Sequence, residues 1–339
     1  ASFQRAVRAA NTIAPLSAQT LNLLHLARHP CGAGLGTAVN GATASRAECI
    51  ATGVPAAVID DAVRRAALDS PAGQYQVNEG GNPALAPEES DTVTAGIIFT
   101  PRFLPGFVAS IDWFNIKVDG LVSTFGPENT LRACYNNGDA AACGRIQRNA
   151  IGQLWLGTGN VADTNINIGG LETTGIDLNI SYSGLELGGA GSLSFNLTGT
   201  YLEDLTTDPG PGLEPYDCTG FFVGACEVPN PEWRHQFRIS YQTPFDLDVS
   251  LTWRHFGKVE SFETPANRID REFDAQNYLD LAGTYAFSDK IGLTVGVNNV
   301  LDKDPPLSSG VGTTGNGNTY PQTYDALGRY IFGRLKVGF

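Results

Sequence analysis

The chain has 339 residues, a formal net charge of −13 and 17% charged residues, below the roughly 25% of ordinary soluble domains. The acidic balance weighs against a nucleic-acid-binding surface. No stretch approaches 18 uninterrupted apolar residues, so no transmembrane helix is expected, although membrane-barrel strands need only about 9–11 residues of alternating character. The chain contains no Met and no signal peptide at Ala1, so we expect a processed chain or one piece of something longer.

Segments that alternate between apolar and polar residues recur along the chain. After a short segment at residues 2–8, they lie at 92–101, 107–122, 175–183, 192–203, 233–243, 247–256, 278–287, 291–299 and 328–339. A strand places successive side chains on opposite faces, so each segment has one apolar and one polar face. The sequence therefore predicts an all-β protein with about ten antiparallel strands.

The segment that ends the chain shows the two faces clearly. Leu335, Val337 and Phe339 share one face, whereas Arg334 and Lys336 lie on the other. An apolar strand face could meet either a protein core or lipid. We expect this strand and its terminal Phe339 to serve insertion and edge closure of a barrel, because an unpaired strand edge in hydrocarbon is costly.

The connections between the predicted strands alternate in length. The short ones are residues 101–106, 184–191, 243–246 and 288–290, and the long ones are about 9–90, 125–168, 204–232, 257–277 and 301–326. Counted back from the C-terminus, every long loop falls on one side of a membrane and every short turn on the other. This is the pattern of an outer-membrane β-barrel, with turns in the periplasm and loops outside. A soluble sandwich would not normally hold an 80-residue connection.

The two faces differ in composition as a membrane barrel requires. The polar face is rich in hydroxyl and amide groups and suits a wet or plugged lumen. It carries the charged residues Arg234, Arg238, Arg254, Arg334, Asp177, Asp248 and Asp280. Aromatic residues near the strand ends of the apolar face fit interfacial girdles: Tyr182, Tyr201, Trp233, Tyr241, Trp253, Tyr285 and Phe287. The alternative is that these rings form the core of a soluble β-protein.

The six cysteines fall as close pairs, and each pair lies within one long connection: Cys31 with Cys49, Cys134 with Cys143, and Cys218 with Cys226. Fifteen pairings of six cysteines are possible, but the local one needs no crossing between loops. It predicts three local disulfides and therefore an oxidising compartment, the periplasm or the cell exterior.

Two further features of the first long connection allow more than one interpretation. His25 and His29 are four residues apart near Cys31, which makes a helical metal pair conceivable, against the alternative of solvated loop residues. Residues 55–68 predict a short helix, with Asp60 and Asp61 toward its start. That helix could be part of a lid over a pore, or it could pack the loop onto its neighbours.

Four segments together resemble the TonB-dependent outer-membrane receptors. They are Ser-Phe-Gln-Arg-Ala-Val-Arg-Ala-Ala-Asn at 2–11, Gly-Gly-Asn-Pro-Ala-Leu-Ala-Pro-Glu-Glu-Ser at 80–90, Gly-Gly-Leu-Glu-Thr-Thr-Gly-Ile-Asp at 169–177 and Asn-Asn-Val-Leu-Asp-Lys-Asp-Pro-Pro at 298–306. They occur in the order of the family across the chain, and the terminal Phe339 matches too. One departure is Ala10, where the family usually has Pro.

The resemblance implies a 22-stranded barrel with an N-terminal plug inside it. It also implies uptake of a scarce nutrient, such as a siderophore or an oligosaccharide, driven by a TonB-type energy-coupling complex in a Gram-negative outer membrane. Residues 1–339 would be the C-terminal part of the barrel, without the plug and the N-terminal strands. We therefore expect an N-terminal receptor fragment as a partner, recognition of Phe339 by the barrel-assembly machinery, and neither a cofactor nor an enzymatic activity.

The sequence is also compatible with two other classes of protein. One is a self-contained ten-stranded outer-membrane barrel, either a pore or a protease, in which residues 2–8 would pair with 330–339. A protease needs a positioned base and acid at the outer rim, and His235 shares a face with Trp233 and Phe237, which favours an interfacial role. The other class is a secreted β-protein such as a carbohydrate-binding module.

The ligand itself is not encoded in a readable motif. Aromatic residues of the long loops could stack on a sugar or an aromatic ligand, or could pack their own loops. The candidate ligand-binding residues are Tyr135, Trp155, Phe221, Phe222, Tyr320 and Tyr324. No metal site is expected.

Overall fold

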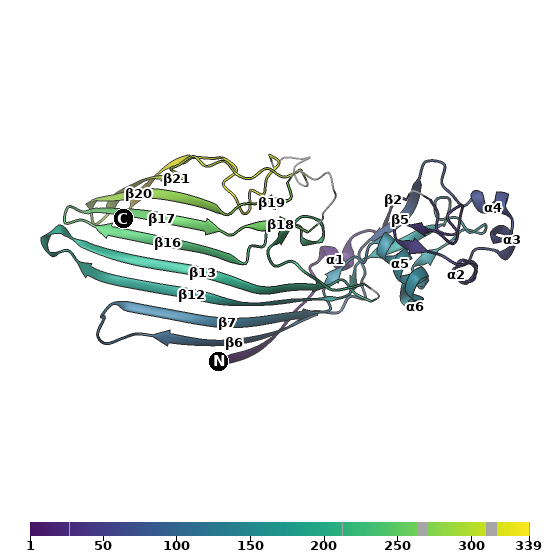
Figure 1. Ribbon diagram of the computed structural model, residues 1–339, viewed down its shortest axis with the longest axis horizontal. Helices are drawn as coiled ribbons and strands as arrows, with labels where there is room; N and C mark the ends of the chain where they lie inside the picture. Colours follow the sequence, from purple (N-terminus) through teal and green to yellow (C-terminus); the bar gives the residue numbers. More distant parts are fainter. Residues whose placement is uncertain (27, 212, 263–269, 310–316, 339) are drawn as a thin grey trace.

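The computed structural model describes residues 1–26, 28–211, 213–262, 270–309 and 317–338. It has two parts, a curved wall of long strands and a separate lobe at one end of that wall (Figure 1). No helix among the described residues is long and apolar enough to cross a bilayer.

The wall is an antiparallel sheet, which confirms the predicted fold class. It contains eleven strands, of which β14 (Tyr216–Asp217) pairs with β13 off the main path, so ten strands form the wall. In spatial order these are β1 (Ser2–Arg8), β6 (Glu88–Phe99), β7 (Phe107–Asp119), β12 (Gly170–Glu186), β13 (Ser192–Asp208), β16 (Trp233–Gln242), β17 (Leu247–Phe256), β20 (Gln276–Ser288), β21 (Ile291–Asn298) and β22 (Tyr330–Val337).

β12 and β13 exceed their predicted lengths by more than any other strand. Each has 17 residues, several more than the 9–11 or so that cross a bilayer. Most of the extra residues, Gly170–Thr174 and their partners Asp204–Asp208, belong to the end nearest the lobe. They are rich in Thr, Asp and Glu, so no apolar face marks them in the sequence, and their strand pairing holds them extended above the apolar band.

The wall is open within the described residues. β1 pairs with β6, from Ser2 opposite Thr94 to Arg8 opposite Glu88, and β22 pairs with β21. The outer edges of β1 and β22 have no strand partner in the part of the chain that the structure covers. Phe339 lies outside the described residues, so its role in barrel assembly stays a prediction.

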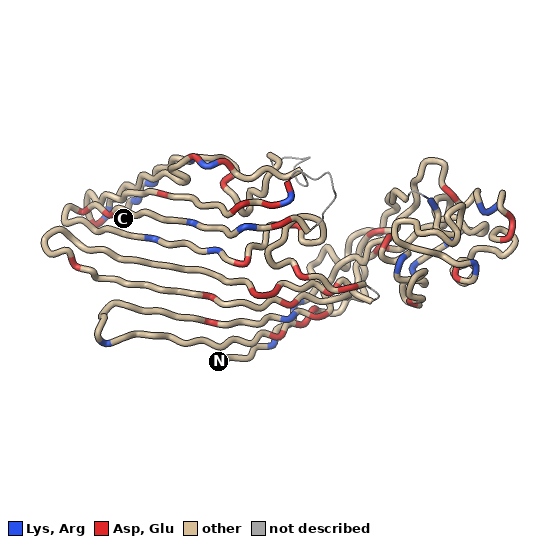
Figure 2. Tube along the Cα trace, in the orientation of Figure 1, with Lys and Arg blue, Asp and Glu red and all other residues tan. Residues whose placement is uncertain are grey.

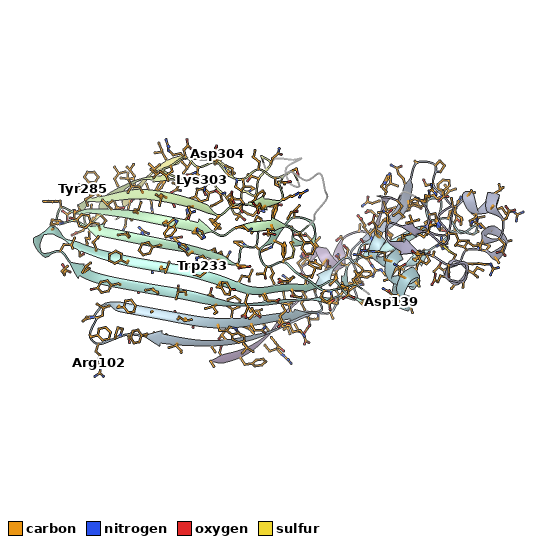
Figure 3. The ribbon with its side chains drawn as sticks, viewed as in Figure 1. Arg102, Asp139, Trp233, Tyr285, Lys303 and Asp304 are labelled. Atoms are coloured by element: carbon orange, nitrogen blue, oxygen red, sulfur yellow. A yellow bond between two sulfur atoms is a disulfide. The ribbon has the colours of Figure 1, made fainter. Side chains whose placement is uncertain are left out.

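All short connections lie at one rim of the wall and all long ones at the other, as the loop lengths predicted (Figure 1). Figure 3 shows Arg102 on a short turn at one rim and Asp139 in the lobe beyond the other. Charged residues are dense where β6, β7, β12 and β13 approach the lobe and sparse along the middle of these strands (Figure 2). This distribution matches a wall with an apolar central band.

The first two long connections fold together into the lobe, which the sequence did not predict. Its sheet has the order β2 (Thr20–His25), β5 (Gln74–Gly80), β10 (Asn160–Thr164) and β9 (Ile146–Gln147). Short helices and pairs surround it: α1 (Ile13–Leu16), β3 (Ala38–Val39), β4 (Ala42–Thr43), α2 (Arg46–Ala51), β8 (Val122–Ser123), α5 (Pro127–Asn137), α6 (Ala140–Gly144) and β11 (Ile166–Asn167). Tyr75, Leu131 and Leu154 are at most 1% exposed in its core.

The predicted helix at residues 55–68 is wrong in extent, because two short helices replace it, α3 (Ala56–Ile59) and α4 (Ala62–Ala66). Asp61 is extended and its carboxylate accepts hydrogen bonds from the backbone N–H groups of Val63 and Arg64. An Asp that caps a new helix in this way ends the preceding one. Asp60, between the helices, pairs with Arg46 of α2 at 2.7 Å.

Candidate functional site

A group of polar side chains lies on one face of the wall near its long-loop rim. Asp177 of β12, Thr200 of β13 and Arg234 of β16 are register neighbours on three adjacent strands. Thr200 donates a 2.7 Å hydrogen bond to Asp177. These residues, with Asn179 and Gln236 among others, line a hollow of about 420 Å³. Arg234 makes no ion pair with the described residues, so its guanidinium is free to bind acidic groups of a ligand.

Arg254 holds the last long loop against this wall. Its guanidinium donates two hydrogen bonds to Asp280 of β20, at 2.7 and 3.0 Å, and two to Asp325 of the loop, at 2.9 and 2.6 Å. It also lies 5.0 Å from the ring centre of Tyr278. Tyr278 accepts a hydrogen bond from the backbone N–H of Asp325. These contacts therefore attach the last long loop to the wall at its long-loop rim.

Three long loops pack together through aromatic rings beside that attachment. Two of them form a small sheet, in which β15 (Phe221–Phe222) comes from the loop after β13, and β18 (Val259–Ser261) and β19 (Glu272–Phe273) come from the loop after β17. Phe222 stacks on Phe273 with ring centres 4.1 Å apart, and Tyr320 of the last loop contacts both rings edge to face. Tyr324 packs against Phe273 as well. The three loops thus form one aromatic layer at this end of the wall.

On the apolar face of the wall, a cluster of Trp and His lies near the same rim. Trp233 donates a 2.8 Å hydrogen bond to His235, whose ring lies 4.5 Å from Trp253 and 5.0 Å from His255. Asn277 accepts a hydrogen bond from Trp253. Toward the opposite rim, Tyr285 packs on a neighbouring ring (Figure 3). Aromatic residues at both ends of an apolar strand face are the arrangement of interfacial girdles.

The centre of the lobe holds a buried arginine. Arg148 donates hydrogen bonds to the carbonyl of Gly152 at 2.7 Å and to the hydroxyl of Tyr135, and its guanidinium lies 2.8 Å from Nε2 of His29. Burial lowers the pKa of Arg148. Burial, followed by the charge of Arg148, lowers the pKa of His29 well below its usual value. His29 is therefore neutral at physiological pH.

His25 and His29 do not form the helical metal pair that their spacing allowed. His25 lies in strand β2, and His29 is fully buried, where its Nδ1 accepts a hydrogen bond from the backbone of Cys31. His29 is thus not a solvated loop residue either. The described residues contain no group of three or more His, Cys, Asp or Glu that could hold a metal ion.

The candidate ligand-binding aromatics fall into two groups in the structure. Tyr135, Phe222, Tyr320 and Tyr324 are at most 2% exposed and pack the lobe or the aromatic layer. Trp155 and Phe221 are partly exposed, and Trp155 donates a 3.1 Å hydrogen bond to the carbonyl of Leu68. Ligand contact by any of the six stays a prediction, with Trp155 and Phe221 as the accessible members. Sequence reasoning missed the hollow around Arg234, although it had placed Arg234 on the polar face.

The three local disulfides are present and confirm the predicted pairing. Cys31 bonds to Cys49, Cys134 to Cys143, and Cys218 to Cys226. The first two stabilise the lobe, and the third closes a turn in the loop that bears Phe221 and Phe222. All of them lie on the long-loop side of the wall.

A family model described as "TonB dependent receptor-like, beta-barrel" matches residues 1–300. The chain belongs to this family. A search of curated proteins gave no match.

This TonB-dependent receptor chain is similar in fold to two solved structures. A mutant of the ferric enterobactin receptor PfeA from Pseudomonas aeruginosa is 16% identical, with a TM-score of 0.52, over 78% of this chain and 33% of its own. The siderophore receptor PirA from Acinetobacter baumannii is 19% identical, with a TM-score of 0.52, over 78% of this chain and 34% of its own. The chain thus spans about a third of the length of these receptors.

Proposed function

We propose that the chain is the C-terminal wall and loop portion of an outer-membrane receptor that imports a scarce nutrient by TonB-coupled energy in a Gram-negative bacterium. One observation carries the proposal. A single antiparallel wall has all its short turns at one rim, and all its long, disulfide-bonded loops at the other. Because disulfides form outside the cytoplasm, that rim suits the cell exterior.

The polar hollow around Arg234 is the proposed ligand-contacting part of the wall. Arg234 is free of ion pairs with described residues, and Thr198, Asn179 and Gln236 add hydrogen-bonding groups beside it. The Asp177 carboxylate, which lines the same hollow, is hydrogen-bonded to Thr200 and makes no ion pair with Arg234. An unpaired guanidinium favours a ligand that carries carboxylate, catecholate or phosphate groups. A ferric chelate therefore fits better than a neutral oligosaccharide. Trp155 and Phe221 would add contacts from the loops.

Polypeptide outside these 339 residues would supply the plug and the remaining strands. The edges of β1 and β22 carry backbone groups without strand partners among the described residues, and each such group left unpaired in hydrocarbon costs several kcal/mol. The other solution, a self-contained ten-stranded barrel, requires β1 to pair with β22. Among the described residues β1 pairs only with β6 and β22 only with β21, and the lack of a ladder between β1 and β22 supports the larger barrel.

Growth of a deletion strain on single iron or carbon sources, with and without the complete receptor, tests the function. Restored growth on one nutrient that also needs the energy-coupling complex would support uptake, whereas growth independent of the receptor on every nutrient would refute it. Arg234→Gln should weaken binding of an acidic ligand by about 10-fold or more, the loss of one charge-assisted contact. Arg102→Gln is the matched control, because Arg102 lies on a short turn at the opposite rim (Figure 3).

A further inference from the structure

Residues 2–25 run along the edge of the wall and then along the edge of the lobe sheet, with β1 and β2 as the edge strands. β1 lies along β6, with residues 2–8 opposite 88–94. Beyond it, the carbonyls of Ser17 and Ala14 accept hydrogen bonds from the backbone of Gly81 and Asn82. β2 then lies along β5, with residues 20–25 opposite 74–79. The free edge of β1 in the wall therefore continues as the free edge of β2 in the lobe.

The hydrogen-bond phase shows which backbone groups of β2 face that edge. The N–H of Leu26 donates to Gly73 at 3.0 Å, so the residues bonded to β5 are the alternate ones before it, Leu24, Asn22 and Thr20. Gln76, opposite Leu23, donates instead to Leu154 on its other side, at 2.8 Å, which agrees with this phase. The N–H and C=O groups of Leu21, Leu23 and His25 therefore point away from β5, toward the free edge.

The side chains of β2 leave this edge without the usual protection. Leu24 faces the lobe core with Tyr75, whereas Leu21 and Leu23 lie on the opposite face and are 55% and 65% exposed. Exposed edge strands are commonly blunted by charged residues, Pro or a bulge. The six residues of β2 include no Lys, Arg, Asp, Glu or Pro, and its register with β5 has no irregularity. Two exposed leucines on a regular free edge form a surface suited to an added strand.

We propose that β2 is a docking edge for the polypeptide segment that pairs with β1, which continues past the membrane as an added strand of the lobe sheet. This inference rests on the proposed function, because it takes its occupant from the barrel strand next to β1. The continuity of the two edges selects this occupant, since a segment already held along β1 reaches β2 at a high effective concentration. The lobe would thereby be fixed to both parts of the barrel.

Hydrogen exchange of the assembled receptor, read at single amides, tests the proposal with an internal control. The amides of Thr20, Asn22 and Leu24 bond to β5 and should be protected in either case. With an added strand, the amides of Leu21, Leu23 and His25 should exchange at least about 100-fold more slowly than unbonded amides. Exchange of these three at the unbonded rate, with the other three protected, would overturn the proposal.

A proline substitution and photo-crosslinking identify the occupant. Leu23→Pro removes an edge-facing N–H while leaving the bonds to β5, and it should unprotect Leu21 and His25 if a strand is bound there. A photo-crosslinker at position 23 should capture the same segment as a crosslinker in β1. Capture of a second copy at position 23, or of nothing, would overturn the inference while barrel closure at β1 stands. Capture of β22 by β1 would instead refute the larger barrel on which it rests.

Discussion

Replacing Arg254 should release the last long loop from the wall. Arg254 bridges Asp280 of β20 and Asp325 of the loop through two hydrogen bonds to each, all between 2.6 and 3.0 Å. Arg254→Gln removes the charge and leaves the two carboxylates facing one neutral amide. Arg254→Lys keeps the charge but cannot donate to both carboxylates in the same paired geometry.

The burial of the three side chains sets the magnitude. The side chains of Arg254, Asp280 and Asp325 are 23%, 18% and 21% exposed, so they are partly buried. A surface ion pair is worth about 0–1 kcal/mol and disruption of a buried one costs about 3–5 kcal/mol, so an intermediate cost is expected. We therefore expect Arg254→Gln to destabilise the docked loop by about 2 kcal/mol. At 1.4 kcal/mol per factor of ten, this corresponds to about 30-fold more frequent opening.

Hydrogen exchange at Tyr324 and Asp325 in the assembled receptor measures that opening. Arg234→Gln is the matched control, because it removes a lumen charge that has no ion-pair partner among the described residues. The double variant Arg254→Gln with Asp325→Asn should cost less than the sum of the two single changes, since each breaks the same contact. Unchanged exchange in Arg254→Gln, or additive effects in the double variant, would refute the role of Arg254 as the loop attachment.

Three further results are expected. Burial depresses the pKa of His29, so its contribution to lobe stability is present above about pH 6.5 and should fall by about 1.4 kcal/mol per pH unit below that value. Hydrogen exchange of the lobe at several pH values measures this slope, and His29→Gln should flatten it. Burial raises the pKa of Asp163, which acts in the opposite sense on acidification, so a lobe whose stability rises steadily from pH 6.5 to 5 would contradict the assignment to His29. Replacing Cys31 and Cys49 by Ser removes a disulfide that joins residues 18 apart in sequence. The change should lower the free energy of unfolding of the lobe by about 3 kcal/mol, measured by thermal unfolding, with no effect expected on the wall. Phe222→Ala should cost about 3–5 kcal/mol in the aromatic layer and expose the three loops to protease, whereas Phe222→Leu should cost less; equal resistance of both variants would contradict the packing seen there.

The sequence by itself determined the wall. β17 was predicted with its observed ends, Leu247–Phe256, because alternation of apolar and polar residues is a local property that any strand between lipid and water must show. The side of each loop followed from connection lengths alone. The disulfides followed in the same way, since Cys134 and Cys143 are close in sequence and needed no tertiary information to be paired.

The tertiary structure decided what the long loops become. Tyr75 and Leu131 are more than fifty residues apart and lie in one lobe core. The pattern of apolar residues in either segment does not predict its contact with the other. Arg254 reaches Asp325 across a separation of 71 residues, so only the fold shows that this polar-face charge attaches a loop, whereas Arg234 makes no ion pair with the described residues. Strand alternation is imposed by the nearest neighbours in the chain and by the membrane. Loop packing is imposed by partners distant in sequence, which only the folded chain brings together.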